Sequence, residues 1–175
     1  MADPAANPSI DWPRVVPLGI LLASLGALTS AYTAQYGFDL EPCILCLYQR
    51  IPYAVAGALA LLALLTPRQR KDGAMVLMVI AAGAAFTIDT GIAFYHVGVE
   101  QHWWVSAAAC GVGGAPAPEN VDQLRQLLMA AKPVKACDEI DWTLFGLSMA
   151  TYNVAVSFAL AAGSFWGASK IRRSP

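Results

Sequence analysis

The stretch AMVLMVIAAGAAFTIDTGIAFY at residues 74–95 decides the fold of this chain. Apart from Asp89 near its end, it carries no charged side chain. A helix that crosses the hydrocarbon core of a bilayer needs about 20 mostly apolar residues, and this stretch is long enough. It therefore predicts a membrane-spanning helix with one carboxyl group inside it, and an intramembrane carboxyl group needs an explanation.

Three further stretches of the same kind occur along the chain. Residues 15–34 and 142–168 contain no charged residue, and residues 47–65 contain only Arg50. The whole chain is 57% hydrophobic and only 13% charged, whereas about a quarter of the residues in a soluble domain are charged. No useful length alternates with a period of two, which argues against a β-barrel. We predict an all-α membrane protein in which residues 1–175 form one domain, a bundle of four transmembrane helices.

The first of these stretches has an alternative interpretation as a cleaved signal peptide. Small residues such as Ala31 and Ala34 imitate a cleavage site. The apolar core of a signal peptide is about 7–15 residues long, however, and residues 15–34 form a longer run. A spanning helix is therefore the better interpretation.

The positions of lysine and arginine predict the orientation of the helices. The segment RQRK at 68–71 lies between the second and third spans, and KIRR at 170–173 follows the fourth. Because lysine and arginine near the ends of spans favour the cytoplasm, we expect that loop and both termini to be cytoplasmic. Residues 35–46 and 96–141 should then face outward. No basic stretch is long enough to predict nucleic-acid binding.

The long outer loop contains two segments of different character. GVGGAPAP at 111–118 combines glycine with proline, so we expect irregular, mobile backbone there. ENVDQLRQLLMAA at 119–131 places its apolar side chains on one helical face and predicts a short amphipathic helix. That face would lie flat on the membrane or pack against the other helices.

The first pair of cysteines, Cys43 and Cys46, forms a CxxC motif at the outward start of the second span. At the start of a helix, the exposed N–H groups and the helix dipole favour a thiolate, which is the species that attacks disulfides. Zinc sites also use CxxC, but they need a second pair of ligands of this kind, which the sequence lacks. The motif therefore predicts a redox-active disulfide and no metal.

The second pair, Cys110 and Cys137, lies in the long outer loop. A structural disulfide that staples the loop is one interpretation. The other is a catalytic disulfide, because the loop beside Cys110 is expected to be mobile and a redox-type CxxC lies on the same side of the membrane. We favour the catalytic interpretation.

Two further residues are candidates for binding a cofactor beside the CxxC. Arg50 lies one turn deeper than Cys46 on the same helical face, where it would steady a thiolate or donate a hydrogen bond to a quinone carbonyl. The alternative is an arginine that reaches out to lipid headgroups. His96, at the outward end of the third span, would donate a hydrogen bond or transfer a proton. The sequence assigns no role to His102, and leaves open whether Asp89 pairs with Arg50 or hydrogen-bonds between helices.

At this point the sequence resembles a known family. PCILCLYQR at 42–50 and CDEIDWTLFGLSMATYN at 137–153 are similar to segments of DsbB, the disulfide bond formation protein B of the bacterial inner membrane. The order of the cysteines also matches, with CxxC before the second span and two separated cysteines before the fourth. Members of that family often have glutamate before the arginine of the motif, whereas this sequence has Gln49.

The resemblance implies a function. A periplasmic thioredoxin-fold oxidase of the DsbA type would be reoxidised through Cys110 and Cys137, which would pass electrons to Cys43 and Cys46 and on to ubiquinone or menaquinone. The cysteine loops would then be periplasmic. Two alternatives remain: a quinone-coupled enzyme of the vitamin K epoxide reductase type, whose CxxC follows its loop cysteines, and a membrane adaptor with purely structural disulfides.

Overall fold

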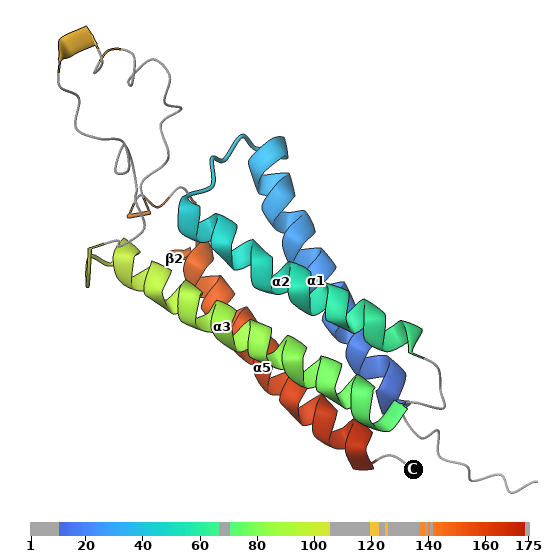
Figure 1. Ribbon diagram of the computed structural model, residues 1–175. Coiled ribbons are helices and arrows are strands. Elements are labelled where there is room, and N and C mark those ends of the chain that lie inside the picture. The colour runs from blue at the N-terminus through green and yellow to red at the C-terminus, as the bar shows by residue number, and fades with distance from the viewer. Residues whose placement is uncertain are drawn as a thin grey trace, which may run out of the picture.

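Four long helices form the body of the molecule (Figure 1). A computed structural model describes residues 11–66, 71–105, 120–122, 125, 137–138, 140 and 142–173. Within these residues the elements are α1 (Trp12–Gly37), α2 (Ile44–Leu65), the short π-helix η2 (Lys71–Met75), α3 (Val76–Glu100), β1 (Thr143–Leu144), β2 (Leu147–Ser148) and α5 (Met149–Arg173). Each of the four α-helices, with α3 counted from Gly73, is long and apolar enough to cross a membrane. The prediction of a four-helix membrane protein is confirmed.

Each of the four helices extends beyond its predicted span at one end at least, and the largest differences are in α3 and α5. α3 continues past Tyr95 to Glu100. The additional turn places His96 and Glu100 on one face of the helix. The fourth span was predicted from Trp142, but α5 begins only at Met149.

A small β-hairpin explains the late start of α5. Thr143 pairs with Ser148 and Leu144 with Leu147, in antiparallel register. Between them, Phe145 (φ 51°) and Gly146 (φ 79°) both adopt positive φ, which a tight two-residue hairpin turn requires. This turn occupies apolar residues that the hydropathy pattern alone assigns to the helix.

Helix α3 packs mainly against α5 and α2, and α1 packs mainly against α2 (Figure 1). The buried surfaces of α2 and α3 consist largely of small side chains, such as Ala56, Ala60 and Ala82. Small residues let helices approach closely, and van der Waals contact rather than the hydrophobic effect drives helix association in lipid. The bundle is therefore held by close packing and by the polar contacts described below.

The predicted amphipathic helix lies largely outside the described residues. Val121, Asp122 and Arg125 are helical where the structure describes them. GVGGAPAP at 111–118 and Cys110 also lie outside the described residues.

The close approach of α3 to α5 at Gly83 gives a test of this packing. A Cβ atom at Gly83 would lie 3.1 Å from the Phe165 ring and 3.2 Å from Cβ of Ser164. We expect Gly83→Leu to force the helices apart and to destabilise the protein by about 1–3 kcal/mol, the usual cost of overpacking. The measurement is thermal unfolding of the purified protein in detergent.

Gly91→Leu is the matched control, because a Cβ atom at Gly91 of the same helix would meet nothing within 4 Å. A Gly83→Leu protein as stable as the Gly91→Leu protein would contradict the packing described here.

Candidate active site around the CxxC motif

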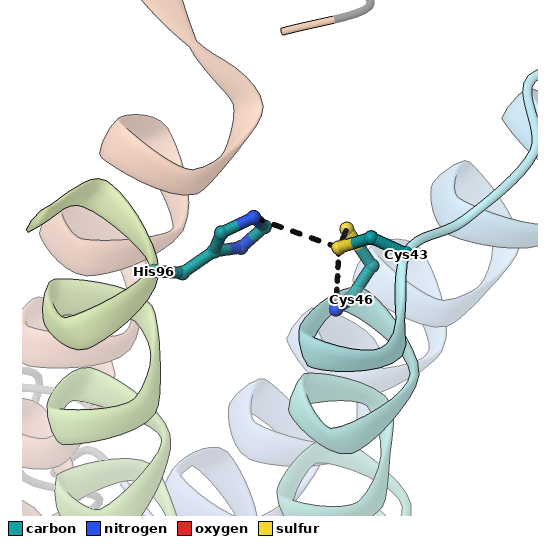
Figure 2. Close-up of side chains that lie close together, drawn as sticks. All are labelled: Cys43, Cys46 and His96. Carbon is teal, nitrogen blue, oxygen red and sulfur yellow. Dashed lines mark hydrogen bonds between the residues drawn. The ribbon is translucent and has the colours of Figure 1, made fainter. Parts of the chain in front are cut away.

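The two cysteines of the CxxC motif lie at the start of α2 (Figure 2). Cys43 has an extended backbone (ψ 168°) and is the N-cap of the helix, and its Sγ accepts a hydrogen bond from the N–H of Cys46 at 3.3 Å. The Cys43 thiol thus takes the position that serine or threonine occupies in many helix N-caps. The two sulfur atoms are 2.9 Å apart, with Cys43 donating to Cys46. Helix initiation therefore places both sulfurs together at a helix N-terminus.

The surroundings of Cys43 hold it in the protonated form. The pKa of its thiol rises from 9.0 to about 12, mainly because of its hydrogen bond with Cys46 and then because of burial. A hydrogen bond with His96 acts in the opposite direction but does not cancel this increase. Cys43 is only 5% exposed, whereas Cys46 is partly exposed. Of the two sulfurs, Cys46 is therefore the one that is open to a reaction partner.

His96 of α3 faces the CxxC motif across the gap between two helices (Figure 2). Its Nε2 lies 3.5 Å from Sγ of Cys43, and its Nδ1 lies 3.0 Å from Nε2 of Gln49. An acidic neighbour, Glu100, comes one helical turn later and places a carboxylate oxygen 3.8 Å from Nε2 of His96. The predicted position of His96, at the level of the CxxC motif, is confirmed.

Cys137 lies beside the first pair. It is 1% exposed and belongs to one apolar cluster with Cys43, Leu45 and Val99, against which Cys46 also packs. Its backbone hydrogen-bonds to His96. One cysteine of the predicted second pair therefore meets the first pair, although these residues are far apart in the sequence. Its expected partner Cys110 lies outside the described residues.

Arg50 points toward α1. Its Nη1 donates a hydrogen bond of 2.6 Å to Oε1 of Gln35, and its guanidinium lies 4.8 Å from the centre of the Tyr32 ring. A cation over an aromatic face is attracted by the electrons of the ring. These contacts hold a positive charge within the apolar bundle, and no ion pair with Asp89 occurs among the described residues.

A cavity of about 640 Å³ opens beside Cys46. α1 contributes small residues to its wall, including Ala27, Ala31 and Ala34, and α5 contributes Val156 and Leu160. The polar residues in its lining include Gln35, Arg50, Tyr53, His96 and Asn153, and both cysteines of the CxxC motif also line it. An apolar cavity with a few polar groups is the usual form of a site for a small organic ligand.

The sequence analysis missed a chain of polar side chains behind His96. Nδ2 of Asn153 donates to Oε1 of Gln49 at 2.8 Å and to Oδ2 of Asp89 at 3.0 Å. The hydroxyl of Tyr53 donates to Oδ1 of Asn153 at 2.6 Å. Of the two possibilities left open for Asp89, the structure has the hydrogen bond between helices. A polar residue within a predicted span, such as Asn153, was the available signal.

The donor atoms of Cys43, Cys46 and His96 all lie within 4.8 Å of one another. Three such atoms are close enough for one ion, but a structural zinc site uses four ligands. Because the sequence lacks a second CxxC, we still favour a redox role over a zinc site. The absence of a metal stays a prediction.

Comparison with known proteins identifies the family. The family model described as "Disulfide bond formation protein DsbB" matches residues 13–167. The chain belongs to the DsbB family. DsbB family proteins act in disulfide bond formation, so this member is a multi-pass membrane protein with a disulfide oxidoreductase role.

Individual relatives agree with this assignment. The chain is 35% identical to the disulfide bond formation protein B of Methylobacillus flagellatus, over 73% of this chain and 76% of that one. It is 31% identical to the protein of the same name from Xanthomonas axonopodis pv. citri, over 87% and 88% of the two chains. The relative of that name from Xylella fastidiosa is 33% identical, over 86% and 87%. No solved structure matches the chain significantly.

The different surroundings of the two sulfurs in this DsbB family member predict different rates of alkylation. Because the thiolate is the reactive form and the pKa of Cys43 is about 12, Cys43 should react much more slowly than Cys46 with iodoacetamide at pH 8. Its rate should increase as the pH is raised toward 12. Mass spectrometry of the reduced protein gives the extent of modification at each cysteine.

Cys46→Ala removes the hydrogen bond that contributes most to the raised pKa, so Cys43 should react faster in that variant. Cys110→Ala, which removes a thiol from the long loop, serves as the control. An unchanged rate at Cys43 in the Cys46→Ala protein would show that this hydrogen bond does not control its reactivity.

Proposed function

We propose that this protein reoxidises a periplasmic DsbA-type dithiol protein and passes the electrons to a membrane quinone. The observation that carries the proposal is the position of the CxxC pair. Both cysteines line the apolar cavity, and both also contact the apolar cluster that contains Cys137, with Cys43 the more buried of the two. The pair thus lies between Cys137, which would deliver electrons, and a cavity that would hold an apolar electron acceptor.

The lining of the cavity suits a quinone. Its apolar walls match an isoprenoid-bearing ring, and Arg50 and His96 are the candidates for holding the ring carbonyls. Arg50 carries a charge, and His96 would share its ring N–H between a carbonyl and Sγ of Cys43, which is 3.5 Å away. When bound, a quinone accepts two electrons and two protons and leaves as the quinol. The cavity does not distinguish ubiquinone from menaquinone.

The thiol steps follow ordinary thiol–disulfide exchange. A thiolate of the partner attacks Cys110 of the Cys110–Cys137 disulfide, which forms a mixed disulfide and releases Cys137 as a thiolate. The second partner thiol then displaces Cys110, so the partner leaves with a disulfide. Cys137 attacks Cys43, which breaks the Cys43–Cys46 bond and releases Cys46 as a thiolate at the cavity wall. Cys110 then attacks Cys137 of the Cys43–Cys137 disulfide, which restores the Cys110–Cys137 bond and releases Cys43. Two electrons and two protons from the partner dithiol thereby reach the CxxC pair.

The direction of electron flow follows from redox potentials. DsbA-type disulfides are strongly oxidising, with potentials of about −120 mV, so ordinary thiols and disulfides do not regenerate them. A stronger terminal acceptor is required, and a quinone dissolved in the bilayer is available where Cys46 lies. We also propose the orientation predicted above, with the loops 35–46 and 96–141 in the periplasm, because the partner's thiols must reach them.

The central test is quinone reduction by the purified protein with a reduced DsbA-type dithiol protein as the electron donor. The wild-type protein should catalyse quinol formation, and Cys46→Ser should abolish it, because that variant cannot form the Cys43–Cys46 disulfide. Cys110→Ser should fail to oxidise the partner. Absorbance of the quinone and gel-shift analysis of partner thiols measure the two half-reactions.

The rival interpretation, an adaptor with structural disulfides, makes a different prediction. Serine at any of the four cysteines would then lower stability without an effect on redox turnover. Quinone reduction at the wild-type rate by the Cys46→Ser protein would sink the proposed function.

A second test concerns the candidate ligands of the quinone. Arg50→Gln removes a charged donor from the cavity wall, and hydrogen bonds to charged groups contribute about 1.5–3 kcal/mol. We expect the KM for quinone to rise by about tenfold or more. Arg14→Gln is the matched control, because its side chain on α1 is 70% exposed and pairs with Asp11. An equal effect of the two substitutions would exclude Arg50 as a quinone ligand.

A further inference from the structure

The hydrogen-bonded side chains behind His96 form a series in which the direction from donor to acceptor is fixed. The donors and acceptors of each group determine that direction. An asparagine amide has two N–H donors and one carbonyl acceptor. Asn153 uses its donors on Gln49 and Asp89 and its acceptor for the hydroxyl of Tyr53. All three contacts agree with a single orientation of the amide, because the other orientation would turn its carbonyl toward the carboxylate of Asp89.

The orientation of Asn153 fixes that of Gln49. Because Oε1 of Gln49 accepts from Asn153, the other end of the glutamine amide is Nε2, which carries only donors. This Nε2 lies 3.0 Å from Nδ1 of His96. Nδ1 must then be the acceptor, and in a neutral imidazole the proton is on the other nitrogen, Nε2.

We propose that Asn153 and Gln49 are positioning residues that hold His96 in the tautomer with its proton on Nε2, directed at the sulfur of Cys43. Asp89, which accepts the first hydrogen bond of the chain, sets its direction. The same Nε2 lies 3.5 Å from Sγ of Cys43 and 3.8 Å from the carboxylate of Glu100, and both are able to accept from it.

The tautomer decides what His96 can do to Cys43. With its proton on Nε2, the imidazole donates a hydrogen bond to sulfur and cannot take the Cys43 proton through that nitrogen. The absence of a proton acceptor at this position fits a reduced pair in which Cys43 keeps its proton and donates it in a hydrogen bond to Cys46. The inference rests on the proposed function only for the role of Cys43, since the tautomer is a property of the resting protein.

The chain also links Asp89 to His96. Reversing the tautomer requires both amides to turn over, and a turned Asn153 would present its carbonyl to Asp89, which is acceptable only if that carboxyl is protonated. Asp89 is fully buried, and the groups that face it come from α5 (Asn153, Ser157) and from α2 (Tyr53). A change at Asp89 should therefore alter the tautomer of the His96 imidazole.

Nitrogen NMR of protein labelled with ¹⁵N-histidine tests the inference directly. The chain contains two histidines, so His102→Gln assigns the signals. In the reduced wild-type protein, at a pH high enough for a neutral imidazole, we expect His96 to have a proton-bearing Nε2 and a bare Nδ1. A proton on Nδ1 with a bare Nε2 would overturn the proposal, and this outcome is independent of any quinone or partner activity.

Gln49→Glu provides the matched perturbation. A carboxylate only accepts, so Nδ1 of His96 must become the donor, and the signals should show a proton on that nitrogen. Gln35→Glu makes the same chemical change on α1, where the side chain contacts Arg50 instead, and should leave the His96 signals in place. Identical His96 spectra for wild-type and Gln49→Glu proteins would overturn the role of Gln49, even if quinone reduction proved normal.

Discussion

The contact between the sulfur of Cys43 and the imidazole of His96 is the interaction on which the site depends. It joins the N-terminus of α2 to the last turn of α3, at 3.5 Å, between residues far apart in the sequence. Helix initiation at Cys43 sets the position of the sulfurs, and the extension of α3 to Glu100 carries the imidazole to the same level. Cys137 then packs into the space that these two helix ends define. A shift of α2 along α3 by one turn would separate all three groups.

Polar contacts rather than apolar packing fix that register. Small apolar residues let helices slide, because many registers bury similar surfaces, whereas hydrogen bonds between helices form in one register only. Each is worth about 0.6–2 kcal/mol in a membrane, but a polar group left without a partner there costs more. Gln49 and Asn153 bridge three helices through His96 and Asp89, so the register that places the sulfur beside the imidazole is also the one that satisfies the polar groups.

The sequence predicts the features of this protein that depend on composition. Hydropathy identifies the four spans, because lipid requires long apolar helices, and the CxxC motif at a helix start marks the candidate redox pair. The β-hairpin before α5 escapes such reasoning, because Leu144, Phe145 and Leu147 are as apolar as helix residues and only their backbone angles differ. The hydrogen bonds of Asn153 also escape it, because a single sequence does not say which side of an apolar helix faces its neighbours. Contact of Cys137 with Cys43 depends on the tertiary fold, which residue spacing does not encode.

The two sulfurs differ in exposure, and this difference bears on a requirement of any thiol oxidase. A strongly oxidising disulfide beside an electron acceptor would be consumed by every small thiol that reached it. Here Cys43 is 5% exposed and covered by apolar residues that include Cys137, so a soluble thiol lacks a direct path to it. Cys46 is the more exposed of the two and lines an apolar cavity, which favours a lipid-soluble acceptor over a water-soluble one. Under the proposed function, electrons enter through Cys137 and leave through Cys46, and the burial of Cys43 supports that order.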